Sequence, residues 1–328
     1  MDRRGFLAAS AVLAGLGVKS MAQGNTDQGW LPSDPGETVG LWPNVPPGGD
    51  GVRLDIKIED YSRDSKIVPD RMAAQIGVPV LQVLRAEKPT GAAMVVMPGG
   101  GYASLWFDKE GYEISRRFNR AGITCFVLFY RLPGEGWAAR ADIPLADAQR
   151  AIRLIRANAA RFAIDPARLG VMGFSAGGHL AASLATRFDA KVYAPVDAAD
   201  RLDARPAYAA LLYPVITMGA GTHQGSRELL LGPDLSPESV TAYSCENLVT
   251  AKTPPTFIAH AADDGTVPFA PNALAMYRAL LQAKVPSELH AFERGGHGFA
   301  LRDMHGQPWT AWPEQFLAWA QDHKFAAA

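Results

Sequence analysis

Three polar residues that lie far apart in the chain have the types and the order that activate a hydroxyl group. Ser175 is the centre of a G-x-S-x-G pattern at residues 173–177, in which a sharp turn between a strand and a helix exposes the serine. A serine attacks an acyl group when a histidine takes its proton and a carboxylate orients that histidine. Asp264 and His297 follow in that order. The sequence therefore predicts a nucleophile, an acid and a base at Ser175, Asp264 and His297.

Other residues compete for two of these roles. Asp263 is adjacent to Asp264, where a carboxylate can also serve to cap a turn. Among the seven histidines, His297 alone follows the acid and has glycines on both sides. We expect His260, on the strand before the acid, to make a structural hydrogen bond, and His179 to lie in the helix after the serine. The others lack a glycine-rich setting or the matching order: His223, His290, His305 and His323.

Three consecutive glycines, residues 99–101, follow a segment with the pattern of a buried strand. Backbone amides in such a loop can face the oxyanion that forms during acyl transfer, and one such donor contributes about 3 kcal/mol. We expect one donor to be the amide of Ala176 and the other to be that of Gly100 or Gly101. An ordinary tight turn is the alternative. Pro98 replaces the histidine of the H-G-G-G motif of esterases, so the choice between the two glycines stays open.

The segments around these residues predict an α/β fold, with a mostly parallel central sheet and helices on both of its faces. Continuous apolar runs are typical of strands buried on both faces, and alternating runs are typical of half-buried strands. We expect strands at 52–59, 78–85, 92–97, 123–129, 168–174, 209–213, 256–261 and 287–292, and helices at 111–121, 145–162, 179–185, 272–283 and 312–325. Pro79 predicts an edge position for its strand. The Gly- and Pro-rich segment 217–239 predicts a loop excursion near the ligand-binding edge of the sheet.

Composition limits the classes of function. The chain has 328 residues, of which 48% are hydrophobic, and a formal net charge of −1. It can therefore bury a large core, and its charge offers no case for binding nucleic acid or an anionic membrane. Cys125 and Cys245 form no disulfide framework, although a single bridge between them stays open. We find no H-E-x-x-H motif, no C-x-x-C pair and no dinucleotide or phosphate-loop pattern at the glycines, so we expect no metal and no cofactor.

The N-terminal residues predict export. Adjacent arginines at positions 3 and 4 precede an apolar run at 8–18 and small residues at 20–22, as in a twin-arginine signal. The run is too short to span a bilayer, so we prefer cleavage after Ala22 to a membrane anchor. The expected organisation is a signal peptide at 1–22, an extended N-terminal arm at 23–51 and a catalytic domain at 52–328. We expect a bacterial protein that is periplasmic or secreted.

Several segments together resemble one known group of proteins. They are residues 41–43, 98–102, 109–112, 129–133, 147–151, 173–179 and 295–299. From about residue 41 to the C-terminus, the chain resembles bacterial α/β-hydrolases of the acetyl-xylan-esterase-like branch, which is related to dienelactone hydrolases and prolyl oligopeptidases. The resemblance implies that Ser175, Asp264 and His297 are the nucleophile, acid and base. In similar loops the acid stands four residues before a proline, here Pro268, which favours Asp264 over Asp263.

The resemblance also implies an activity, the removal of acetyl groups from acetylated xylan or xylo-oligosaccharides through an acyl-enzyme. The partner would be a small-molecule or oligosaccharide ester, with no nucleic acid and no membrane after signal cleavage, and the oligomeric state is left open. Tyr102, Trp106 and Trp137 are candidates to stack on a sugar ring, or else are core or rim aromatics. The alternatives are a serine peptidase, another short-chain or feruloyl esterase, and an inactive carbohydrate-binding relative. Dienelactone hydrolysis is disfavoured, because that branch usually has a cysteine nucleophile.

Overall fold

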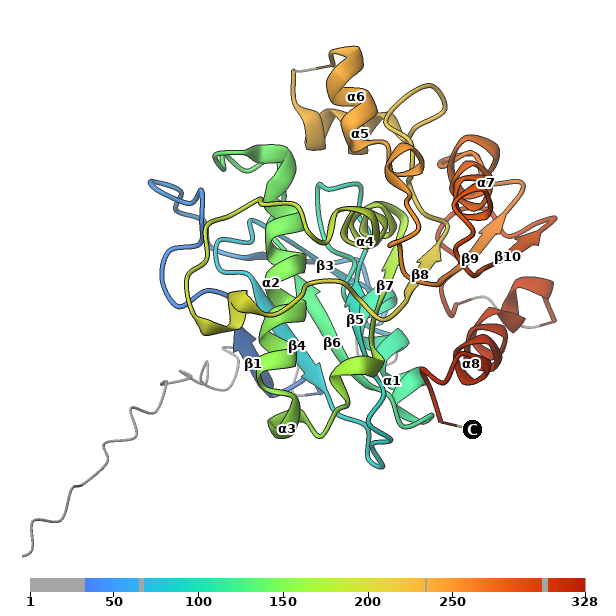
Figure 1. Ribbon diagram of the computed structural model, residues 1–328, viewed down its shortest axis with the longest axis horizontal. Coiled ribbons are helices and arrows are strands. Elements are labelled where there is room, and N and C mark those ends of the chain that lie inside the picture. The colour runs from blue at the N-terminus through green and yellow to red at the C-terminus, as the bar shows by residue number, and fades with distance from the viewer. Residues whose placement is uncertain (1–32, 65–67, 234, 303–305, 328) are drawn as a thin grey trace, which may run out of the picture.

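The structure, a computed structural model, describes residues 33–64, 68–233, 235–302 and 306–327 (Figure 1). Its strands are β1 Glu37–Gly40, β2 Lys57–Asp60, β3 Arg71–Ala74, β4 Val80–Leu84, β5 Ala93–Met97, β6 Thr124–Phe129, β7 Leu169–Phe174, β8 Ala209–Leu212, β9 Thr256–Ala261 and β10 Ser287–Phe292. Its α-helices are α1 Glu113–Asn119, α2 Ile143–Ala157, α3 Ala159–Phe162, α4 Ser175–Arg187, α5 Gln224–Leu231, α6 Pro237–Tyr243, α7 Ala275–Gln282 and α8 Trp312–Asp322. Shorter helical turns include Asp108–Tyr112, directly before α1.

One sheet organises the molecule. Within the described residues it has eight strands in the order β1-β4-β6-β5-β7-β8-β9-β10, and β2 and β3 form a separate antiparallel pair. Neighbouring strands from β6 to β10 in this order are parallel, whereas β4 runs antiparallel to both β1 and β6. Since parallel strands end at the same edge, the loops after β5, β7, β9 and β10 can meet there. The predicted mostly parallel α/β architecture is confirmed.

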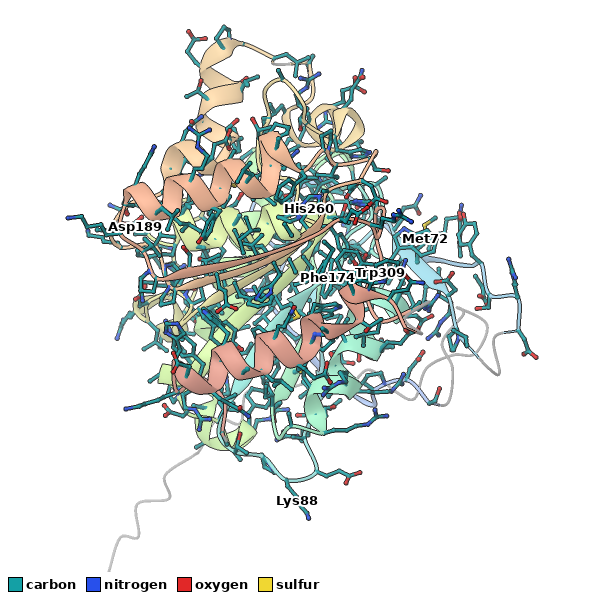
Figure 2. The ribbon with its side chains drawn as sticks, turned by 90° about the vertical axis from the view of Figure 1, so that its right-hand side faces the viewer. Met72, Lys88, Phe174, Asp189, His260 and Trp309 are labelled. Carbon is teal, nitrogen blue, oxygen red and sulfur yellow. The ribbon has the colours of Figure 1, made fainter. Side chains whose placement is uncertain are left out.

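Helices cover both faces of this sheet. In Figures 1 and 2, α2, α4 and α7 lie on one face, and α1 and α8 lie on the other. The helices α1 and α8 meet through Phe118 and Phe316, whose ring centroids are 5.2 Å apart. Because both faces are covered, β5, β6 and β7 are buried along their whole length. Each large apolar side chain fully buried there contributes about 1.5–3 kcal/mol to the stability of the fold.

The structure differs from the sequence predictions in three places. Strand β1 lies within the predicted arm and pairs with β4, with Gly40 opposite Val80, so the sheet begins before the predicted domain boundary at residue 52. Strand β4 is not at an edge, because Pro79 precedes the strand and its missing N–H removes no bond from the ladder. The predicted loop 217–239 contains α5 and the start of α6. Their side-chain N-caps, His223 and Ser236, explain why two short helices form there.

Other predictions concern the termini and the cysteines. The predicted signal peptide and the first part of the arm lie outside the described residues. Cys125 and Cys245 are both free and buried, so the single bridge that the sequence left open is not formed. Burial raises the pKa of each thiol to about 12. In the part of the chain that the structure describes, no helix has the length and apolar character needed to cross a bilayer.

A buried polar cluster, here called the arm cluster, ties the N-terminal segment to α2. It consists of Trp42, Arg131 and Asp147. The guanidinium of Arg131 donates to both oxygens of Asp147 at 2.8–3.1 Å, and its backbone amide donates to Oδ2 at 2.9 Å. The indole of Trp42 donates to Oδ1 of Asp147 at 2.8 Å, and Nη1 of Arg131 donates to the carbonyl of Pro47 at 2.7 Å. The side chains of Arg131 and Asp147 are 0% exposed, so the ion pair is fully desolvated.

Candidate active site

Ser175 stands at the junction of β7 and α4. Its φ is +51°, a left-handed conformation that residues with a side chain rarely adopt. The turn is tight: a β carbon on Gly173 would lie 2.1 Å from the carbonyl oxygen of Gly177, and one on Gly177 would lie 2.1 Å from that of Met97. Only glycine fits at these two positions. Ser175 is the first residue of α4, a helix of 13 residues, and the N-terminus of a helix favours negative charge. The serine is 8% exposed.

His297 connects Ser175 to Asp264. The hydroxyl of Ser175 donates to Nε2 of His297 at 2.9 Å, and Nδ1 of His297 donates to Oδ2 of Asp264 at 2.7 Å. The glycines on either side of His297, at positions 295, 296 and 298, all have positive φ, which lets the loop after β10 turn back toward the serine. In this arrangement an imidazole can remove the serine proton while a carboxylate stabilises the resulting cation. The structure thus brings the three predicted residues together.

Asp264 is held ionised by its surroundings. Its Oδ1 accepts the backbone amides of Thr266 and Val267 at 2.9 and 2.8 Å, and its Oδ2 accepts Nε2 of His260 at 3.1 Å as well as His297. Burial by itself raises the pKa of Asp264, but the hydrogen bonds from His260 and His297, followed by the charge of His297, outweigh it and hold the pKa well below its usual range. Its side chain is 0% exposed, so the negative charge acts on His297 with little screening.

The neighbouring residues Asp263 and His260 have separate roles. Asp263 is exposed, and its Oδ1 accepts the backbone amide of Gly296 at 2.8 Å, so it supports the histidine loop and does not touch His297. His260 is the second-to-last residue of β9, at the carboxyl end of that strand (Figure 2). Its Nε2–H also reaches the carbonyl of Val267 at 2.9 Å. The sequence predicted a structural hydrogen bond for His260, but gave no sign that the acid itself accepts it.

The three glycines at 99–101, here called the glycine loop, lie directly against the nucleophile. A β carbon on Gly99 would lie 2.9 Å from Cβ of Ser175. The amides of Gly100 and Gly101 have no hydrogen-bond acceptor among the described residues, and neither has the amide of Ala176 in the first turn of α4. Unpartnered amides beside a nucleophile can bind the oxyanion of an acyl-transfer intermediate. The geometry leaves both glycines as donors alongside Ala176.

Glu110 fixes the start of this loop, and the sequence analysis had not assigned it a role. Its Oε2 accepts the amide of Gly99 and its Oε1 accepts the hydroxyl of Tyr213, both at 2.8 Å. The ring of Tyr213 lies edge-on to that of His297, with their centroids 5.2 Å apart. A single buried carboxylate therefore connects the glycine loop to the base. The signal that could have found Glu110 is the segment 109–112, one of the segments that carry the family resemblance.

Tyr102 is not placed to stack on a substrate, which corrects the prediction. Its side chain is 1% exposed, and its hydroxyl donates to Nδ1 of His179 at 2.8 Å. Nε2 of His179 donates in turn to the carbonyl of Tyr243 at 2.8 Å. Burial lowers the pKa of His179 to about 4, so the ring is neutral near neutral pH. This chain of hydrogen bonds joins the glycine loop to α4 and to the end of α6.

The two tryptophan candidates differ from each other. Trp137 is 6% exposed, and the guanidinium carbon of Arg131 lies 5.1 Å from its ring centroid, so it is a core aromatic and that prediction is also corrected. Trp106 is half-buried, and its backbone amide donates to the carbonyl of Gly99 at 3.0 Å. Its ring centroid is 5.4 Å from that of Tyr61, which is 53% exposed. Trp106 therefore stays a candidate, with Tyr61 as a neighbour that the sequence pattern did not indicate.

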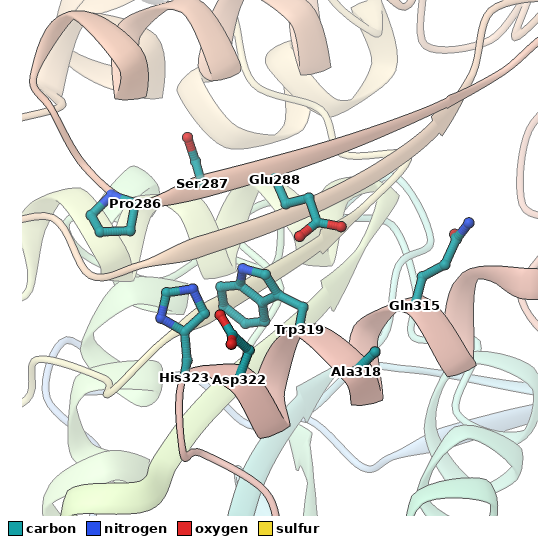
Figure 3. A pocket seen from close by; sticks show the side chains of 8 residues that line it. All are labelled: Pro286, Ser287, Glu288, Gln315, Ala318, Trp319, Asp322 and His323. Carbon is teal, nitrogen blue, oxygen red and sulfur yellow. The ribbon is translucent and has the colours of Figure 1, made fainter.

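A groove with a volume of about 540 Å³ lies elsewhere, between β10 and α8 (Figure 3). It is lined by Pro286, Ser287, Glu288, Gln315, Ala318, Trp319, Asp322 and His323. The strand residues among these are the first of β10, whereas His297 follows the carboxyl end of that strand. The groove is therefore at the opposite end of β10 from the candidate site, and we assign it no part in the chemistry.

The described residues also bear on metal binding. Among them, no group of three or more His, Cys, Asp and Glu side chains is arranged to hold a metal ion. Both nitrogens of His297 and both oxygens of Asp264 have protein partners. The chain itself supplies a nucleophile, a base, an acid and oxyanion donors, which is a complete set for acyl transfer.

Comparison with known proteins agrees with this geometry. A family model described as BD-FAE matches residues 82–280, more than half of the chain. An acetylxylan esterase of Xylanibacter ruminicola is 36% identical over 220 residues, which are 66% of this chain and 42% of the relative. An endo-1,4-beta-xylanase B of Butyrivibrio fibrisolvens is 38% identical over 208 residues, which are 63% of this chain and 32% of the relative. The chain thus spans less than half the length of these two curated relatives.

A solved structure matches over nearly its full length. The acetyl ester-xyloside bifunctional hydrolase of Caldicellulosiruptor lactoaceticus is 34% identical, with a TM-score of 0.69, over 89% of this chain and 97% of that one. This likeness and the order of the strands confirm the predicted α/β-hydrolase fold.

Proposed function

This chain belongs to the BD-FAE family, and from that premise we propose that it is a serine carboxylic ester hydrolase that removes acetyl groups from acetylated xylan or xylo-oligosaccharides. One observation carries the proposal: His297 lies 2.9 Å from the hydroxyl of Ser175 and 2.7 Å from the carboxylate of Asp264. These contacts give each side chain its role. Ser175 is the nucleophile, His297 the general base and acid, and Asp264 the residue that orients His297.

The first half of the reaction forms an acyl-enzyme. Nε2 of His297 takes the proton of Ser175 as Oγ attacks the acetyl carbonyl. The oxyanion of the tetrahedral intermediate lies on the amides of Ala176 and of Gly100 or Gly101, and the N-terminus of α4 adds its positive end. The bond to the sugar oxygen then breaks, and that oxygen takes the proton from His297. The products of this half are a free sugar hydroxyl and acetylated Ser175.

The second half releases acetate. Water, bound where the sugar oxygen left, gives a proton to Nε2 of His297 and attacks the acetyl carbon. The same amides stabilise the second oxyanion. The bond to Oγ breaks, Ser175 regains its proton from His297, and acetic acid leaves. In both halves Asp264, which keeps its negative charge at working pH, stabilises the imidazolium of His297.

The choice of substrate is supported by the relatives. An acetylxylan esterase and a hydrolase of acetyl esters and xylosides are among the proteins that this chain resembles. The half-buried Trp106, with Tyr61 beside it, offers an aromatic surface next to the glycine loop on which a sugar ring can stack. We also propose that the protein is exported through its twin-arginine-like N-terminus and acts in the periplasm or outside the cell, where such oligosaccharides arrive.

The test is acetate release from acetylated xylo-oligosaccharides by the wild type and by Ser175→Ala. We expect Ser175→Ala to keep the wild-type circular dichroism and melting temperature, and to lose about 10³-fold or more in kcat. A fluorophosphonate probe should label the wild type and not the variant. Feruloyl esters, p-nitrophenyl acetate and short peptides serve as comparison substrates. Acetate release that survives the loss of Ser175 would exclude the proposed nucleophile, and preference for feruloyl esters or peptides would exclude the proposed substrate.

A further inference from the structure

His223 lies beside the glycine loop, on the segment that leaves the sheet after β8. A β carbon on Gly101 would lie 3.5 Å from Cε1 of His223. The ring is half-buried. Burial lowers the pKa of His223, and the charge of His297 lowers it further, while Asp264 acts in the opposite direction. The charges of the base and the acid therefore both act on His223, although within the described residues it forms no hydrogen bond or ion pair with either.

The hydrogen bonds of His223 fix the position of its proton. The backbone amide of Ser226 donates to Nδ1 of His223 at 3.2 Å, and the hydroxyl of Ser226 lies 2.8 Å from the same atom. An imidazole that accepts a backbone N–H at Nδ1 carries its proton on Nε2 in the neutral form. Within the described residues Nε2 has no partner, and it is not among the buried side-chain atoms that lack one, so it is accessible to solvent. The ring thus holds an N–H donor, fixed in place by the backbone, that is open to solvent next to the glycine loop.

We propose that His223 recognises the alcohol part of the ester, by donating Nε2–H to a hydroxyl or ring oxygen next to the ester bond. This inference rests on the proposed function and deepens it. The oxyanion is taken by backbone amides, and the acetyl group carries no further polar atom. The alcohol oxygen takes its proton from His297, and the ring of His223 lies against Gly101, in the loop next to the reacting ester. A donor there selects acetates of sugars and polyols over acetates of alcohols that have no neighbouring oxygen.

His223 is also the N-cap of α5, so a useful variant must separate capping from recognition. In His223→Asn, the side-chain oxygen reaches the position of Nδ1 and still accepts the amide of Ser226, and asparagine is a favoured N-cap. This variant removes only the donor at Nε2. In His223→Gln, the amide N–H reaches the position of Nε2, but the cap is lost because glutamine is too long to accept the Ser226 amide. The two variants therefore remove one function each.

The experiment compares kcat/KM on a monoacetylated methyl xyloside and on p-nitrophenyl acetate. For His223→Asn we expect about a tenfold loss on the xyloside, as for one neutral hydrogen bond, less than a twofold change on p-nitrophenyl acetate, and an unchanged melting temperature. For His223→Gln we expect a lower melting temperature and a smaller loss on the xyloside than in His223→Asn.

Two results would overturn the inference. If both kcat/KM values of His223→Asn equal those of the wild type, His223 serves only as a cap. If it lowers both values equally, the donor acts on the oxyanion and not on the alcohol. Failure of the proposed function looks different, since the wild type itself would then hydrolyse neither ester through Ser175, and this inference would be lost with it.

Discussion

Two buried polar groups of similar size, the catalytic triad and the arm cluster, are built in opposite ways. In the arm cluster, Arg131 and Asp147 are 0% exposed, and the indole of Trp42 and the carbonyl of Pro47 add further hydrogen bonds to the pair. In the triad, His297 is 21% exposed and Ser175 holds a strained φ of +51°. The amides of Gly100, Gly101 and Ala176, beside the triad, have no partner among the described residues.

The difference shows how the same interactions serve structure in one place and chemistry in another. A closed cluster gains by leaving no donor or acceptor unpaired, because an unpaired buried charge is costly. A reactive site needs the reverse, with groups held in position whose last partner is the reacting molecule. The strained Ser175 and the unpaired amides of Gly100, Gly101 and Ala176 therefore lie together at the carboxyl edge of the sheet, and the arm cluster stabilises the fold away from them.

The largest expected effect comes from Asp264→Asn. Because the amides of Thr266 and Val267 hold an oxygen at Oδ1, the NH₂ group of the new side chain would face His297. His297 would then carry its proton on Nε2 and could no longer accept the proton of Ser175. We expect kcat to fall about 10⁴-fold. Steady-state kinetics with p-nitrophenyl acetate measure this directly.

Asp263→Asn is the matched control, one residue away and also carboxylate to amide. Its side chain supports the amide of Gly296 and does not reach the imidazole, so we expect kcat within about fivefold of the wild type, as for a neutral hydrogen bond partly retained. The reverse ranking of the two variants would move the acid to Asp263.

The second effect is on stability, from Asp147→Ala in the arm cluster. This substitution leaves the guanidinium of Arg131 buried and unpaired, so the free energy of unfolding should fall by about 3–5 kcal/mol. The kcat of the protein that remains folded should stay near the wild-type value. Urea unfolding, with activity normalised to the folded fraction, measures both quantities.

Glu37→Gln is the control for Asp147→Ala. Glu37 pairs with Arg85 and Arg161 on the surface, where the arginine side chains are 41% and 39% exposed, so we expect a loss of no more than about 1 kcal/mol. A large loss of kcat in folded Asp147→Ala would show that the arm cluster takes part in the chemistry, and the comparison would fail.

The smallest effect is a pH dependence of stability from His179. Its pKa is about 4 when folded, against 6.5 for an ordinary histidine, so only the unfolded chain binds the proton between these values. The contribution of His179 is complete above pH 6.5. It is lost as the pH falls toward 4, at up to about 1.4 kcal/mol per pH unit and about 3 kcal/mol in all.

Urea unfolding of the wild type and of His179→Gln at pH 7, 5.5 and 4.5 would measure the contribution of His179 to the free energy of unfolding. Glutamine can still donate to the carbonyl of Tyr243 but cannot titrate, so the variant should lose less stability than the wild type between pH 7 and 4.5. Equal losses in the two proteins would show that His179 is not buried in its neutral form.

Much of the fold could be predicted from the sequence, because local pattern and tertiary environment agree in most strands. The predicted strands 256–261 and 287–292 coincide with the buried β9 and with the partly buried edge strand β10. The predictions that failed depended on pairing. Glu37–Gly40 has no pattern of its own and is a strand because β4 pairs with it. Pro79 suggested an edge, but it lies one residue outside the ladder.

Some residues of the site could likewise be predicted from the sequence, and others could not. The G-x-S-x-G turn, the glycines around His297 and the three glycines at 99–101 are local requirements of backbone geometry, and they could be recognised without coordinates. Residues that act across the fold could not. His260 lies in an apolar run and Glu110 follows two other charged residues, so neither stands out locally, and their partners, Asp264 and the amide of Gly99, became known only from packing. Tyr102 was misplaced for the same reason, since its partner His179 is 77 residues away.

The sequence by itself determined which chemistry the chain can do, because a strained turn, a glycine-flanked histidine and an acid between them are needed for that chemistry and are written in local residue types. Only the tertiary structure decided which carboxylate faces the imidazole, which amides stay unpaired and which aromatic rings are buried. The physical reason is that hydrogen bonding and burial depend on the distance between atoms in space, and residues far apart in the chain carry no local signal of that distance.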